Sequence, residues 1–118
     1  MSKILLISIV FSWSIMSIMS GCENDKPHLT VPEDKMIKIF YDLHTANYIV
    51  KKAPVDIRDS LSREYTGQIF ENHNVSKEEF EKNLKILEKH PDYFVSFYKK
   101  LEKYSDSLMQ KIHNQKPE

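Results

Sequence analysis

The sequence predicts an all-α domain, a small bundle of about four helices that are mostly antiparallel. Apolar residues recur every three or four positions in four separate segments, which is the spacing of one helix face. Short breaks that contain proline or asparagine separate these segments, and short connections favour antiparallel neighbours. Apolar and polar residues do not alternate along any segment in the pattern typical of a β-strand.

Residues 1–21, ahead of these helices, have the features of a secretory signal. Lys3 precedes an apolar run, Ile4 to Met19, and small residues lead to Gly21 and then Cys22. The run is about 16 residues long, whereas a helix needs roughly 20 residues to cross a bilayer. The stretch resembles the lipobox of bacterial lipoproteins, which implies cleavage between Gly21 and Cys22 and a covalent lipid on Cys22. An ordinary signal peptide or an uncleaved anchor remain the alternatives.

Composition narrows the function classes further. Cys22 is the only cysteine, so a lipid on it leaves no thiol for a disulfide, a metal or catalysis. The chain from Cys22 onward is long enough for one domain, and its basic and acidic residues nearly balance. We therefore expect no nucleic-acid partner. Only two glycines occur, which excludes a glycine-rich phosphate loop, and we expect no cofactor beyond the covalent lipid.

The domain boundaries follow from these patterns. We expect residues 22–30 to form the lipidated cysteine and a polar tether, 31–113 the helical domain, and 114–118 a frayed tail. The first helix should begin near Pro32, with Thr30 or Val31 at its cap, and end at Lys52 before Pro54.

The remaining helices have equally local signals. The second is expected over 56–73, with Gly67 interpreted as a point where a neighbouring helix approaches closely, and Asn74 as a left-handed stop. The third begins with a capping box of Ser76 and Glu79. The fourth runs from Pro91 to about His113, and its apolar residues form a seam over nearly three heptads.

The polar residues indicate little chemistry. The histidines do not pair with one another, or with an acidic residue, at the spacing of a helical metal site, so we expect no metal site. Asp42 and His44 are two residues apart on the first helix and therefore point in different directions, which excludes an acid–base dyad. Nothing meets the requirements of a catalytic site, and we expect a protein that is not an enzyme.

A binding groove is the functional interpretation that the polar residues allow. Tyrosine suits an interface because one end is apolar and the other is polar. The residues of this groove are expected to be Tyr41, Asp42, His44, Tyr48 and Tyr98. Packing of the tyrosines at the edge of a small core is the alternative.

Two segments resemble a known family. Residues 31–37 with 41–44, and Phe70 with 75–80 and the break at Pro91, are similar to a Bacteroidota family of small lipoproteins that carries a domain of unknown function. The resemblance implies a lipoprotein of the cell envelope, in the outer membrane and facing the periplasm or the cell surface.

These observations lead to one functional hypothesis and one alternative. The hypothesis is a non-enzymatic, lipid-anchored helical module whose partner is another envelope protein or a peptide. The alternative is an accessory subunit of an envelope enzyme or transport system that binds a small ligand, a lipid or a glycan. The apolar stripes can be covered by packing within one chain or by packing against a second copy, so the sequence leaves the oligomeric state open.

Overall fold

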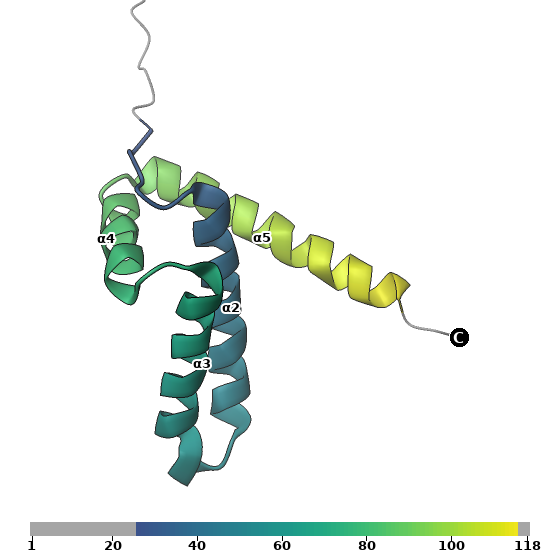
Figure 1. Cartoon of the computed structure of the whole chain (residues 1–118). Helices are drawn as coiled ribbons and strands as arrows, with labels where there is room; N and C mark the ends of the chain where they lie inside the picture. The colour runs from purple at the N-terminus through teal and green to yellow at the C-terminus, as the bar shows by residue number, and fades with distance from the viewer. Residues whose placement is uncertain (1–25, 116–118) are drawn as a thin grey trace, which may run out of the picture.

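The computed structural model describes residues 26–115, which fold into four α-helices and one short 3₁₀ helix (Figure 1). The elements are α2 (Glu33–Lys52), η2 (Val55–Ile57), α3 (Arg58–His73), α4 (Lys77–Glu88) and α5 (Pro91–Asn114). No strand occurs within the described range, and the predicted all-α class with four helices is confirmed. The predicted signal segment, Cys22 and the last three residues lie outside this range.

Helices α2 and α3 form an antiparallel hairpin (Figure 1). Pro54 has no backbone N–H to continue α2, so the chain turns there and enters α3 through η2. Pro32 occupies the N-cap of α2, so the expectation of Thr30 or Val31 at that cap is wrong. Pro32 has an extended conformation, and its carbonyl accepts the first hydrogen bond of the helix, from Met36.

The connection between α3 and α4 has the predicted stop and start signals. Asn74 is in the left-handed conformation with a φ of 51°, and it ends α3. Two residues later, the Ser76 hydroxyl accepts a hydrogen bond of 3.1 Å from the Glu79 backbone N–H and caps α4. These short-range signals therefore set the boundary between the two helices.

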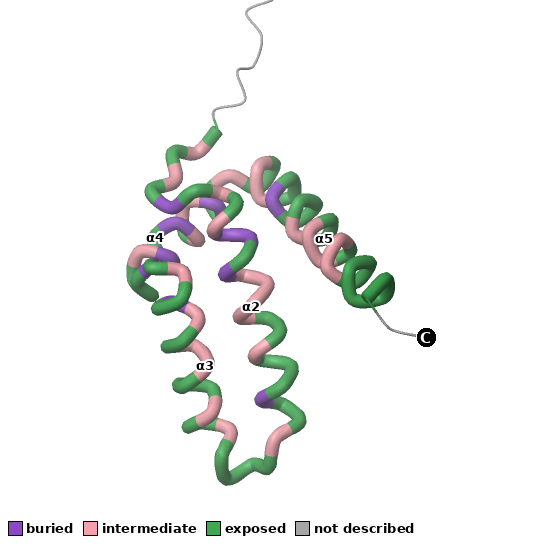
Figure 2. Tube along the Cα trace, turned by 45° about the vertical axis from the view of Figure 1, so that its right-hand side comes forward, coloured by how far each residue is buried: buried purple, intermediate pink, exposed green. Residues whose placement is uncertain are grey.

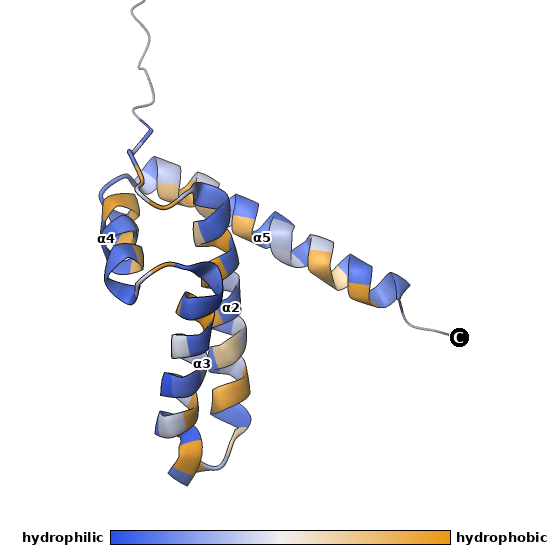
Figure 3. Ribbon diagram, viewed as in Figure 1, coloured by the Kyte–Doolittle hydropathy of each residue, from blue (hydrophilic) through white to orange (hydrophobic). Residues whose placement is uncertain are grey.

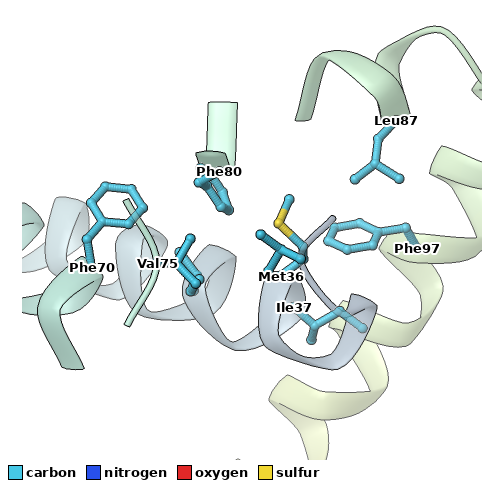
Figure 4. Packing of buried hydrophobic residues seen from close by; sticks show 9 residues of the cluster. Met36, Ile37, Phe70, Val75, Phe80, Leu87 and Phe97 are labelled. Carbon is cyan, nitrogen blue, oxygen red and sulfur yellow. The ribbon is translucent and has the colours of Figure 1, made fainter. Parts of the chain in front are cut away.

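The core lies at one end of the α2–α3 hairpin, where all four helices meet (Figure 2). Figure 4 shows side chains from each helix converging on this point, with Met36, Phe80 and Phe97 at its centre. The fully or nearly fully buried hydrophobic residues of this cluster are Val31, Met36, Ile37, Ile39, Phe70, Val75, Phe80, Leu87 and Phe97.

Gly67 lies on α3 outside this core. An added methyl group at Gly67 would meet nothing within 4 Å. The expectation that a neighbouring helix approaches closely at this glycine is therefore wrong, because the residue lies on the exposed side of α3.

Helix α5 crosses α2 near the core and then projects away from the other helices (Figures 1 and 2). Phe97 is completely buried and Leu101 is half-buried, but Met109 and Ile112 are 64% and 65% exposed. The predicted seam is thus packed as far as Tyr104, and its last residue, Ile112, is exposed. Figure 3 shows hydrophobic residues continuing along the helix beyond the region that the other helices cover.

Candidate binding groove

An open groove lies between α2 and α5, just beyond the point where the two helices cross. Its volume is about 450 Å³. Most of its lining is apolar or aromatic, with a few polar groups, which is typical of a binding surface. The lining residues are Phe40, Tyr41 and His44 of α2, and Tyr98, Leu101, Glu102 and Ser105 of α5.

Aromatic contacts hold both walls of this groove. The ring of Phe40 meets Tyr98 edge-on with centroids 6.0 Å apart, and Tyr98 packs in the same way on Phe94 at 5.1 Å. Tyr41 of α2 meets Tyr104 of α5 edge-on at 5.5 Å. Nearly half of Tyr98 is nevertheless exposed to solvent. The walls are therefore fixed by packing while their faces remain accessible.

Three of the five residues expected in a groove lie together here: Tyr41, His44 and Tyr98. Tyr48 is 59% exposed and lies two turns beyond Tyr41 on α2, outside the groove lining. The Lys52 ammonium group sits over the Tyr48 ring, 4.4 Å from its centroid.

Asp42 belongs to a different contact. Its carboxylate accepts a hydrogen bond of 2.7 Å from Nε2 of His73, which links α2 to α3. Asp42 and His44 therefore face different neighbours, as their spacing predicts, and Asp42 does not line the groove. The sequence gives no signal for His73 as the partner, because the two residues are 31 positions apart.

A polar cluster fixes the start of α2 against α5. The Glu33 carboxylate accepts hydrogen bonds from the Tyr93 hydroxyl and, at 2.5 Å, from the Lys100 ammonium group. Partial burial opposes ionisation of Glu33, but these two bonds and the charges of Lys100 and Lys26 together lower its pKa below 4.5. Burial and the bond to Glu33 raise the pKa of Tyr93 to about 12. The cluster therefore links α2 to α5 where the two helices cross, next to the groove.

Asn83 of α4 holds the segment that leads into α2. Its carbonyl oxygen accepts hydrogen bonds from the backbone N–H groups of Thr30 and Val31, at 2.8 and 3.2 Å. Its amide donates to the Thr30 hydroxyl at 2.8 Å and to the Glu79 carbonyl at 2.7 Å. Asn83 is completely buried. A polar residue between Phe80 and Leu87 on the apolar face of a helix was the signal that could have revealed this role.

Two other hollows occur in the described chain. One lies at the end of α5 and has a volume of about 670 Å³. The other lies beside α3, has a volume of about 490 Å³, and has Gly67 and Phe70 among its lining residues.

Within residues 26–115, no three histidine, cysteine or acidic side chains gather closely enough to hold a metal ion. None of the helices in this range combines the length and apolar character needed to cross a membrane.

The fold and the groove define a small all-α domain with an open surface between two diverging helices. The model of one protein family, described as a domain of unknown function (DUF4296), matches residues 27–113. The match covers most of the chain and every residue of the groove, and the chain belongs to this family. No curated protein and no solved structure matches the chain.

Proposed function

We propose that this protein is a lipid-anchored lipoprotein of the cell envelope that binds a segment of another envelope protein and catalyses no reaction. The lipobox around Cys22 and the sequence resemblance to Bacteroidota lipoproteins support the anchor and the location. The groove between α2 and α5 supports the binding role, and it is the observation that carries the proposal.

The groove suits a protein segment because both of its helices continue past it. Tyr48 on α2 and Met109 and Ile112 on α5 remain exposed beyond the groove lining. A partner that covers exposed apolar groups of this kind stabilises the complex by roughly 25 cal/mol per Å² of apolar surface removed from water. A partner segment that spans the groove and these flanking residues would bury more apolar surface than one that fills the groove alone.

A small ligand is the second candidate occupant. The volume of about 450 Å³ falls within the range of small-molecule sites, about 300–1,000 Å³. Such sites usually bury most of their ligand. Here Tyr98 is 48% exposed and His44 is exposed as well, so one side of any small ligand would face water. This openness favours a protein segment over an enclosed ligand.

Site-specific photo-crosslinking in cells tests the proposal. A photoreactive residue at His44, inside the groove, should give one defined protein adduct. The same residue at Asn72, on the exposed side of α3, should not. Identical adducts from both positions would contradict a binding role for the groove.

A pair of matched variants adds a second control. Tyr98→Arg places a charge on the groove wall, whereas Val95→Arg places the same charge on an exposed position of the same helix outside the groove. Tyr98→Arg should remove the adduct formed at His44, and Val95→Arg should leave it unchanged. Retention of the adduct in Tyr98→Arg would refute the groove as the binding site.

A further inference from the structure

We propose that the occupant of the groove is an acidic amphipathic helix that lies in the open angle between α2 and α5. This inference rests on the proposed function, and it adds the shape and the charge of the partner segment. The shape follows from the two helical arms that flank the groove, and the charge follows from the lysines that they carry. We define the two arms as residues 44–52 of α2 and 98–114 of α5.

Beyond the groove the two arms diverge, and both carry apolar side chains at helical spacing. On α2, Tyr48 follows His44 by four residues, which places it one turn further along the same side. On α5, Leu108 and Ile112 follow Leu101 and Tyr104 along one stripe. The arms diverge in both Figure 1 and Figure 2. Helices pack on one another at interaxial distances of about 8–10 Å, so a helix seated in the groove could contact both arms.

The excess of positive over negative charge in the described chain lies in these arms. They contain six lysines and two acidic residues, a net charge of +4, which falls to +3 when Glu33, the ion-pair partner of Lys100, is counted with them. The rest of residues 26–115 contains nine basic and twelve acidic residues, a net charge of −3. The arms therefore attract an acidic partner although the chain as a whole has no net charge.

The α2 arm carries the clearest part of this signal. Residues 43–52 contain no acidic side chain, and Lys51 and Lys52 are both exposed at the end of the helix. Lys52 stacks on Tyr48, so an apolar surface and a positive charge are presented together. An incoming helix with leucines on one face and glutamates beside them would satisfy both features.

A second copy of this chain fits the space less well. The end of α5, with Met109 and Ile112, is an exposed apolar stripe of the described chain that could enter it. That stripe is accompanied by the lysines of the same arm, so its insertion would bring like charges together. Charge complementarity therefore favours a separate acidic segment.

The test uses the full chain in nanodiscs of zwitterionic lipid and two fluorescent peptides. Both peptides form helices of about 18 residues, roughly five turns, with the same leucine stripe. One carries glutamates beside the stripe and the other carries lysines. We expect fluorescence anisotropy to show that the glutamate peptide binds at least about tenfold more tightly at low salt, with a preference that shrinks as salt is added.

Two variants of equal charge change locate the effect. Lys51→Glu combined with Lys52→Glu should remove the preference for the glutamate peptide. Lys85→Glu combined with Lys89→Glu, exposed residues at the end of α4, should retain it. Loss of the preference in both double variants would overturn the assignment to the arms, since it would then follow from net charge alone.

The remaining outcomes separate this inference from the proposed function. Equal binding of both peptides, weakened by Tyr98→Arg but not by Val95→Arg, would overturn the acidic partner and leave the groove as a binding site. Binding of neither peptide would overturn the helical partner, and the crosslinks at His44 would still decide the proposed function. The binding is also measured in nanodiscs that contain anionic lipid. If that lipid displaces the glutamate peptide, the surface binds the membrane, and the inference is overturned.

Discussion

Asn83→Ala should destabilise the domain, because the Asn83 side chain holds the segment in front of α2. The substitution removes the acceptor of two backbone N–H groups, of Thr30 and Val31, and the Val31 contact is buried. A buried N–H group without a partner costs about 1–3 kcal/mol, and the half-buried Thr30 bond contributes about 0.5–1.5 kcal/mol. The better helix propensity of alanine returns roughly 0.5 kcal/mol. The expected loss in the free energy of unfolding is therefore about 1–4 kcal/mol.

Urea denaturation followed by far-ultraviolet circular dichroism measures this loss. Asn72→Ala is the matched control, because Asn72 is exposed on α3 and its replacement should be neutral or slightly stabilising. Hydrogen exchange gives a second readout, since the amides of Thr30 and Val31 should exchange faster in Asn83→Ala. A loss below about 0.5 kcal/mol, with unchanged exchange at these amides, would refute the role of Asn83.

Four further predictions concern other parts of the molecule. Gly67→Ala should raise the free energy of unfolding by up to about 1 kcal/mol, because an added methyl group meets nothing within 4 Å; a lower melting temperature would contradict this. The raised pKa of Tyr93 favours the folded state below pH 10, and this contribution should disappear as the pH rises towards about 12; Tyr93→Phe should flatten that part of the stability curve. The lowered pKa of Glu33 favours the folded state at pH values above the ordinary pKa of a glutamate, so the free energy of unfolding should fall as the pH drops through the acid range. The fall should be smaller in Lys100→Met, because the lysine that helps to lower this pKa is then absent. Cys22→Ala should abolish metabolic labelling with a fatty acid and release the chain from membranes; unprocessed chain still in the membrane fraction would refute the lipobox.

The helices were predictable because their boundaries depend on neighbouring residues. Pro54, Asn74 and the Ser76–Glu79 cap act over a few positions, and the structure places each at a helix end. The cap of α2 was predicted less well, since Thr30 and Val31 are held by Asn83 instead of capping the helix. A distant contact there overrides a local preference.

The groove was only partly predictable. Tyr41, His44 and Tyr98 could be chosen because they border apolar stripes, and the structure brings them together. Asp42 was grouped with them through proximity in the sequence, yet it binds His73 on another helix. Helical periodicity gives the direction of a side chain from its own helix, but not which neighbouring helix it will meet.

The sequence by itself determined the all-α class, the positions of four helices and the local signals that separate them, because these depend on interactions within a few residues. It also supplied the predicted lipid anchor at Cys22. Only the tertiary structure decided that α5 diverges from α2, that a groove opens beside their crossing, and that Asn83 and Glu33 fix the start of α2. These features depend on the angle at which helices pack, and many side chains far apart in the sequence set that angle together.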